Sequence, residues 1–299
     1  MGFISNPQRS MLAILQKLLP KKVLLLLYEM QSNNGKIVKK LDKFTMELAL
    51  NEYIDQTILK YGFFEAVTTE WITNSLKEGD VMVDVGANIG YMSLVGRAAV
   101  GEKGTVWAVE PTQYAQRKLQ RNIALNNWTN IKVVKMAFAT FTQSQVDITF
   151  NPDEYLTGSQ NSMRSSWALE KDKIGTQQVE KDYCDFMPLD DFVEKNNITK
   201  IDLLKVDVDG HEKSVLLGGQ KTIAKLLPAI ILEIDWTRNL DENKQFSVEL
   251  RTFFNQLFEN HHYTAQAENG GQFSEINSFL AYLEQCSYTG TSPNFLFKR

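Results

Sequence analysis

The chain has 299 residues, of which 43% are hydrophobic and 23% charged, and its formal net charge is −4. This length and composition suit a full α/β core with an added subdomain. A general nucleic-acid-binding protein would usually carry a basic excess, so the acidic balance argues against that class. Two cysteines are too few for a disulfide framework or a zinc knuckle, and a reducing cytoplasm is the expected location.

Residues 1–70 are expected to form a helical extension before the main domain. Asn6 and Pro7 are typical of a helix start, and leucines at helical spacing follow until Pro20. Two interpretations of this basic, leucine-rich start stay open. In the first, it is a membrane-surface helix or a dimer face, and a dimer face would make the protein a homo-oligomer. In the second, it is a helical lid packed on the catalytic domain. Polar residues and Pro20 interrupt the apolar stretch at residues 11–28, so no transmembrane span is expected.

A nucleotide-binding turn is predicted at Val81–Gly90. Alternating valines predict a strand buried on both faces, Gly86 and Gly90 mark a sharp turn, and a helix follows. Glycine lets the backbone approach a ligand beside the positive end of the helix. Asn88 replaces the middle glycine of the dinucleotide fingerprint, and Asp84 inside the strand would repel a pyrophosphate. Both features favour S-adenosylmethionine, which has an amino-acid end, over NAD.

The second predicted strand, Gly104–Pro111, ends in a carboxylate. Glu110 is placed to accept hydrogen bonds from both ribose hydroxyls of a bound nucleotide. A third strand is predicted over Ile131–Phe138, and its last residues, Ala137 and Phe138, would contact an adenine ring. Core packing explains Phe138 equally well.

After the third strand, the alternation of strands and helices is interrupted. Residues 151–187 include a long polar run, and a loop of this length is usually functional or disordered. We expect an insertion on the acceptor side of the site, with a solvated loop as the alternative.

Acidic side chains gather where the next two predicted strands end. Ile201–Gly210 reads as the fourth strand and Ala229–Asp235 as the fifth. Ligands bind outside the carboxyl ends of parallel strands, so one crevice is expected to receive Asp207, Asp209, His211, Glu233 and Asp235. Tyr263–Ala267 and Asn294–Phe297 are expected to complete the sheet as an antiparallel pair.

Five blocks occur in order at suitable spacing: Asp84–Tyr91, Ala108–Pro111, Asn122–Asn126, Leu189–Phe192 and Leu204–Glu212. Together they resemble the FkbM family of S-adenosylmethionine-dependent methyltransferases, over about Tyr53 to Phe297. The resemblance implies a Rossmann-like class I methyltransferase domain over residues 71–299. Its fold would be α/β, with a seven-stranded, mostly parallel sheet and helices on both faces. This chain departs from the family's usual glutamate at position 209 and aromatic residue at position 211.

The resemblance also implies the cofactor and its contacts. S-adenosylmethionine would be bound by Asp84, Gly86, Asn88, Gly90, Glu110, Ala137 and Phe138. The segment Tyr61–Glu65 matches a Gly-aromatic-Glu element of the family, so Glu65 would close over the cofactor. The alternative for Glu65 is an ordinary acid at a helix N-terminus.

The expected activity is O-methylation of a hydroxyl on a small molecule, namely a natural product, a polyketide or a sugar. A hydroxyl loses a proton as it attacks, so a base is needed, and Asp207 and His211 are the candidates. The carboxylates could instead hold Mg²⁺. Acids at strand ends also pair with lysines such as Lys205, so a metal-free site is favoured. The alternatives are a peptide, amine or carboxylate acceptor, or a non-catalytic cofactor-binding scaffold.

Overall fold

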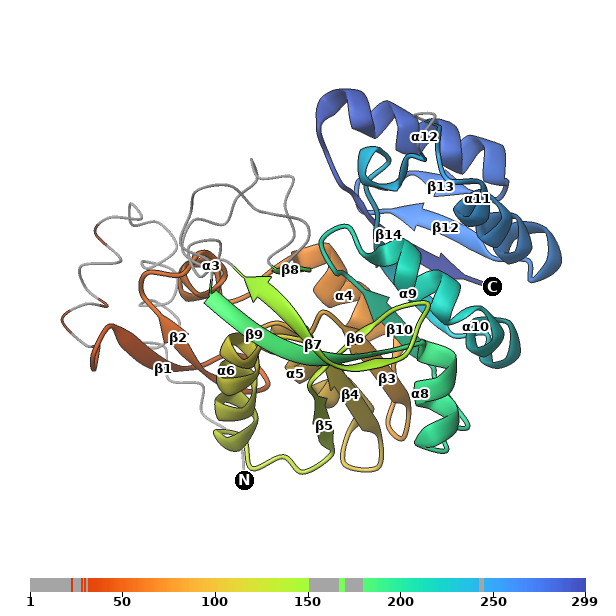
Figure 1. The fold of residues 1–299 in the computed structure, drawn as a ribbon. Coiled ribbons are helices and arrows are strands. Elements are labelled where there is room, and N and C mark those ends of the chain that lie inside the picture. Colours follow the sequence, from red (N-terminus) through yellow and green to blue (C-terminus); the bar gives the residue numbers. More distant parts are fainter. Residues whose placement is uncertain are drawn as a thin grey trace.

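The computed structural model describes residues 23, 28, 30, 32–150, 167–169, 180–241 and 245–299. Its central sheet consists of β3 (Val81–Val85), β4 (Thr105–Val109), β5 (Ile131–Val134), β10 (Leu203–Val206), β11 (Ala229–Glu233), β12 (Thr264–Ala267), β13 (Gln272–Phe273) and β14 (Asn294–Lys298). The strands lie in the order β13-β12-β14-β11-β10-β3-β4-β5 (Figure 1).

Neighbouring strands from β5 to β11 are parallel, and β14 runs antiparallel to both β11 and β12. The Rossmann-like class I fold and its antiparallel final pair are therefore confirmed. The sheet has eight strands rather than seven, because the short strand β13 pairs with β12.

Helices cover both faces of this sheet (Figure 1). They are α3 (Tyr53–Tyr61), α4 (Ala66–Ser75), α5 (Tyr91–Val100), α6 (Gln113–Ala124), α8 (Leu189–Lys195), α9 (Glu212–Gly218), α10 (Gln220–Leu226), α11 (Val248–Asn255) and α12 (Ile276–Thr289). Alternate strand residues enter different cores, as the period of two requires. Val83 and Leu204 pack with α8, α9, α11 and α12, whereas Met82 and Leu203 pack with α3 to α6.

The N-terminal extension is not helical throughout. An antiparallel hairpin, β1 (Lys36–Lys40) with β2 (Thr45–Ala49), follows the turn at Asn34 and Gly35. The predicted helix that starts at Asn6 lies outside the described residues. Among the residues that are described, no helix combines the length and apolarity that crossing a membrane requires.

A second, smaller sheet begins directly after β5 in the chain. Its strands are β6 (Met136–Phe138), β7 (Gln143–Phe150), β8 (Trp167–Leu169) and β9 (Glu180–Met187), in the order β6-β9-β7-β8. The predicted single strand over Ile131–Phe138 is therefore divided, because Val134 still pairs in the main sheet while Met136 pairs with β9. Most of the predicted insertion, residues 151–166 and 170–179, lies outside the described part.

Candidate functional site

Strand register brings four charged side chains onto one face of the sheet. Asp84 on β3 lies opposite Lys205 on β10, and Val206 lies opposite Leu232 on β11. The next position along each strand places Asp207 beside Glu233. Side chains two residues apart point to the same face, so Asp84, Lys205, Asp207 and Glu233 form one row. The sequence prediction of acids gathered at this sheet edge is explained by this register.

Lys205 is the centre of this row, although its side chain is only 2% exposed. Its Nζ lies 2.9 Å from Asp207 Oδ2 and 3.7 Å from Asp84 Oδ1. Burial alone would lower the pKa of Lys205, but the charges of Asp207 and Asp84 raise it above its usual value. Asp84 is fully buried and also accepts a 2.5 Å hydrogen bond from Ser93 Oγ. Lys205 is thus a buried cation that compensates two carboxylates.

The carboxyl groups of Asp207 and Glu233 have pKa values shifted in opposite directions. Burial would raise the pKa of Asp207, but Lys205 and a hydrogen bond from Glu233 hold it below the usual value. Burial and the neighbouring charge of Asp207 raise the pKa of Glu233 well above its usual value. These opposite shifts favour an ionised Asp207 that accepts a hydrogen bond from the protonated form of Glu233.

A cavity opens above this row at the carboxyl ends of the strands. It is lined by Ile54, Phe64, Glu65, Gly86, Ala87, Asn88, Ile89, Tyr91, Met92, Glu110, Pro111, Lys205, Asp207, Val208 and Asp209. We call it the acidic cavity, because its lining includes four carboxylates and one ammonium group.

Glu65, the residue immediately before α4, lines the acidic cavity. Its backbone is left-handed, with φ 42°, and its Oε2 is buried without a hydrogen-bond partner in the described part of the chain. Burial, followed by the charge of Asp207, raises the pKa of Glu65 to about 7. A buried acceptor atom without a partner indicates a place where a ligand donor would bind.

Another part of the lining of the acidic cavity is built around Glu110. Its two carboxylate oxygens accept hydrogen bonds from the backbone N–H of Asn88 (2.9 Å) and from the N–H and Oγ1 of Thr112 (3.0 and 2.7 Å). Burial raises the pKa of Glu110 to about 7, against the effect of these bonds. Asn88 has φ 49°, and its Oδ1 is a second buried acceptor with no partner among the described residues.

A second cavity adjoins the first and is mostly apolar. It is lined by Val85, Gly86, Val109, Pro111, Met136, Ala137, Phe138, Val208, His211 and Val215. We call it the apolar cavity. Gly86, Pro111 and Val208 line both cavities, so the two are contiguous. The structure thus separates His211 from Asp207 and places it with Ala137 and Phe138.

The two predicted glycines have different surroundings. A Cβ at Gly86 would lie 1.8 Å from the carbonyl oxygen of Asp207, so close packing between strands, together with φ 81°, requires glycine there. Gly90 lines neither cavity. Its φ of 91° favours glycine, and a Cβ on it would also lie 2.3 Å from the side chain of Leu119, so backbone conformation and helix packing together account for Gly90.

Two other acids predicted at the strand ends, Asp209 and Asp235, also have different surroundings. Asp209 lines the acidic cavity, whereas Asp235 lines neither cavity and instead accepts hydrogen bonds from Thr237 and Ser292. Sequence reasoning missed Ile54, for which the sequence carries no specific signal. Tyr91 and Met92 were also missed, although their position directly after the glycine turn could have indicated them. Within the described ranges, no group of three or more His, Cys, Asp or Glu residues is arranged to hold a metal ion.

Comparison with known proteins identifies relatives of this chain. Methyltransferase 1 of Beauveria bassiana (strain ARSEF 2860) is 27% identical over 163 residues, covering 51% of this chain and 64% of that protein. Hexuronic acid methyltransferase AglP of Haloferax volcanii is 27% identical over 142 residues, covering 48% of this chain and 51% of that protein. The chain therefore spans between half and two thirds of the length of these curated relatives.

A crystal structure of methyltransferase FkbM from Methylobacillus flagellatus KT shares 16% identity at a TM-score of 0.42. The similarity covers 81% of this chain and 52% of that one. Residues 84–289, which include both cavities except for Ile54, Phe64 and Glu65, match the methyltransferase FkbM domain family. This match extends over more than half of the sequence, and the chain therefore belongs to the FkbM methyltransferase domain family.

Proposed function

We propose that the protein is an S-adenosylmethionine-dependent O-methyltransferase that acts on a hydroxyl of a small molecule, such as a natural product, a polyketide or a sugar. The observation that carries this proposal is the acidic cavity joined to the apolar cavity at Gly86. A charged chamber beside an apolar one, at the carboxyl ends of parallel strands, suits a ligand with an ionic end and an aromatic end. Membership of the FkbM family supports methyl transfer as the activity.

The residues present fit the cofactor. Ala137, Phe138 and His211 would contact the adenine ring, and Glu110 would accept from the ribose hydroxyls. The partnerless oxygens of Asn88 and Glu65 support this placement, because both are buried acceptors on the cavity wall. When bound, S-adenosylmethionine supplies an electrophilic methyl group on a good leaving group. The protein then has to align the acceptor oxygen and exclude water.

Proton removal from the acceptor is the remaining chemical task. Asp207 is ionised but paired with Lys205, so it suits a role as hydrogen-bond acceptor that orients the hydroxyl. Glu65 has a pKa near the operating pH and an oxygen without a partner, so it suits the role of proton acceptor. His211 lines the apolar cavity, which favours a contact with the cofactor over the catalytic role first considered for it.

The charge of the acidic cavity favours an uncharged acceptor. Glu65, Asp207 and Asp209 line it with Lys205 as the cation, and Lys205 is already shared between two acids. A carboxylate-bearing acceptor would be repelled by these groups. We therefore favour a neutral sugar or another neutral alcohol, even though one curated relative is named a hexuronic acid methyltransferase.

The test is the formation of S-adenosylhomocysteine with matched acceptors: a neutral hexoside, its hexuronate counterpart, a hydroxylated macrolide and an amine. We expect turnover with a neutral alcohol. Glu65→Gln should reduce it at least ~10²-fold, the lower range for loss of a positioned acid–base group, and Asp207→Asn should also reduce it because the acceptor hydroxyl is no longer oriented. Asp235→Asn is the matched control, because Asp235 lies at the same sheet edge and lines neither cavity.

Other outcomes would contradict the proposal in distinct ways. Cofactor binding without turnover on any acceptor would favour the non-catalytic scaffold, and turnover on the amine alone would favour N-methylation. If EDTA abolished activity and Mg²⁺ restored it, Asp207 would be better interpreted as a metal ligand.

A further inference from the structure

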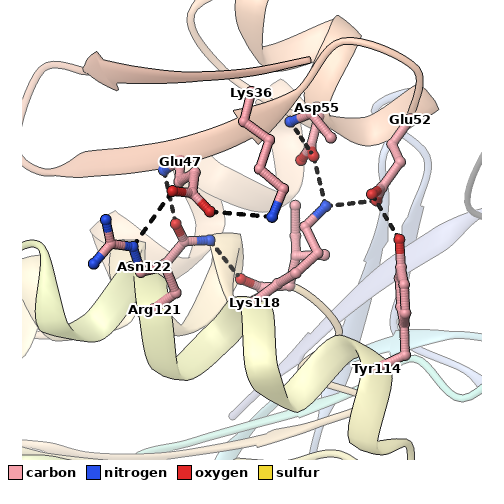
Figure 2. Close-up of polar contacts among 10 residues, drawn as sticks. Lys36, Glu47, Glu52, Asp55, Tyr114, Lys118, Arg121 and Asn122 are labelled. Atoms are coloured by element: carbon pink, nitrogen blue, oxygen red, sulfur yellow. Dashed lines mark hydrogen bonds and ion pairs between the residues drawn. The ribbon is translucent and has the colours of Figure 1, made fainter. Parts of the chain in front are cut away.

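A buried ion-pair cluster lies between α3 and α6, outside both cavities. Lys118 Nζ on α6 lies 2.5 Å from Glu52 Oε2 and 2.6 Å from Asp55 Oδ2 on the facing segment (Figure 2). The side chains of Lys118, Glu52 and Asp55 are only 14%, 7% and 0% exposed. Tyr114, one turn before Lys118, donates a 2.8 Å hydrogen bond to the other oxygen of Glu52. We call these four residues the Lys118 cluster.

The acids of the Lys118 cluster depend on the lysine. Burial raises the pKa of Asp55, and the charge of Lys118 is the strongest influence in the other direction. Asp55 Oδ2 also accepts the backbone N–H of Ala49 at 2.8 Å, which ties α3 to the end of β2. Without Lys118, two carboxylates would be left at low exposure with no cation between them, which is a costly arrangement.

The cluster joins two segments that both supply lining residues of the acidic cavity. Ile54 lies between Glu52 and Asp55 in the chain and lines the cavity. Glu110 and Pro111 also line the cavity and lie immediately before Thr112, the N-cap of α6. A movement of α3 relative to α6 would therefore change the shape of the cavity.

The other end of α3 is also held in place and leads to Glu65. Leu59, in the last turn, accepts hydrogen bonds from Lys39 Nζ at 2.6 Å and from the hydroxyl of Tyr28 at 3.1 Å. The helix ends at Tyr61, and Gly62 follows with a φ of 84° that reverses the chain. Phe64 and Glu65 come next and line the acidic cavity. Because only a few residues separate the end of α3 from Glu65, a shift of α3 would also displace Glu65.

We propose that Lys118 is a positioning residue for the cofactor site: by pairing with Glu52 and Asp55 it fixes α3, and with it Ile54 and Glu65, at the distance from Glu110 that the cofactor requires. This inference rests on the cofactor assignment proposed above. It adds a determinant of affinity that touches neither cofactor nor acceptor. A wall fixed in advance lowers the ordering cost of binding.

The chain offers a matched control on the same helix. Arg121, about one turn beyond Lys118, forms an ion pair with Glu47 of the hairpin at 3.4 Å (Figure 2). The side chains of Arg121 and Glu47 are 55% and 23% exposed, and the pair does not hold α3. Arg121→Met therefore removes a cation of the same helix without loosening the cavity wall.

The experiment measures S-adenosylhomocysteine affinity by calorimetry for wild type, Lys118→Met, Lys118→Arg and Arg121→Met, at a temperature where circular dichroism shows each variant folded. We expect Lys118→Met to weaken binding by about tenfold or more, because the wall is no longer preorganised. Lys118→Arg should recover most of this loss, and Arg121→Met should bind as wild type does. A merely structural role would lower the melting temperature but leave the affinity of the folded protein unchanged.

Two results would overturn the inference: wild-type affinity in folded Lys118→Met, or an equal loss in Arg121→Met. If Lys118→Met does not fold, Tyr114→Phe, which removes the hydrogen bond to Glu52, decides the question. A loss of about twofold to threefold in Tyr114→Phe supports the inference, and an unchanged affinity overturns it. Failure of wild type to bind S-adenosylhomocysteine would instead contradict the cofactor assignment, so the two failures are distinguishable.

Discussion

The acidic and apolar cavities are neighbours that share Gly86, Pro111 and Val208, yet their linings differ in kind. Ionisable groups line the acidic cavity, and their pKa values are shifted by burial and by one another. In the apolar cavity the lining is aliphatic and aromatic, with His211 as its ionisable residue. One sheet edge thus places a charged lining and an apolar lining side by side, with Gly86 in both.

The largest effect is expected from Lys205, on which the charged half of this comparison depends. Lys205→Met leaves Asp84 and Asp207 without their buried cation and should reduce the free energy of unfolding by about 3–5 kcal/mol. Urea unfolding followed by circular dichroism measures the change. Lys213→Met is the control, because its ion pair with Glu249 is exposed to solvent and should contribute little to stability. Equal losses in the two variants would show that burial of Lys205 is not decisive.

The next effect concerns Glu110, which lines the acidic cavity. Glu110→Ala should weaken S-adenosylhomocysteine binding by about 1.5–3 kcal/mol, the usual size for hydrogen bonds to a charged group. The control is Glu212→Ala: this residue is also buried, and burial also raises its pKa to about 7, but it lines neither cavity. Calorimetry that finds wild-type affinity in folded Glu110→Ala would show that the ribose is bound elsewhere.

The affinity for the cofactor should depend on pH, because Glu65 in the acidic cavity titrates near neutral pH. Glu65 has a pKa of about 7, so it is neutral below that pH and anionic above it. An anion attracts the cationic cofactor, so affinity for S-adenosylmethionine should increase between pH 6 and 8, by up to about tenfold. Glu65→Gln should flatten this profile, leaving the smaller slope that Glu110 provides. An unchanged slope in Glu65→Gln would assign the titration to another group.

The smallest effect is expected in the apolar cavity. His211→Ala should cost about 0.5–1.5 kcal/mol of cofactor affinity, the range of one ordinary contact. It should change the turnover of the bound complex little. Single-turnover kinetics with saturating cofactor separates the two quantities. A drop of more than about tenfold in turnover at unchanged affinity would restore His211 as the base.

The sequence was informative where a residue's position along a strand fixes its place in the sheet. Gly86, Glu110 and Asp207 were assigned to the carboxyl edge because parallel strands end together, and each directly follows the last residue of β3, β4 or β10. His211 was assigned to the same crevice, but this argument did not fix its position within it. Asp209 and Gly210 are consecutive left-handed residues, with φ 52° and 102°, and the chain turns there before His211. Strand periodicity carries no information about the side to which such a turn leads.

Other elements were missed although the sequence contained a signal. In β2, Met46 and Leu48 are fully buried at alternate positions, which is a strand pattern inside a segment expected to be helical. In α12, Ile276, Phe279, Leu280 and Leu283 follow helical spacing and are buried. The Lys118 cluster was beyond sequence reasoning, because its partners lie more than sixty positions apart and no local pattern relates them.

We propose that the two cavities together hold one molecule of S-adenosylmethionine, with its adenine in the apolar cavity and its methionine end in the acidic one. A crystal structure of the complex with S-adenosylhomocysteine would test this placement. We expect the ring beside Ala137, Phe138 and His211, the ribose hydroxyls on Glu110, and the sulfur facing Asp207 and Glu65. Adenine in the acidic cavity, or a ligand that touches neither Glu110 nor Phe138, would contradict it.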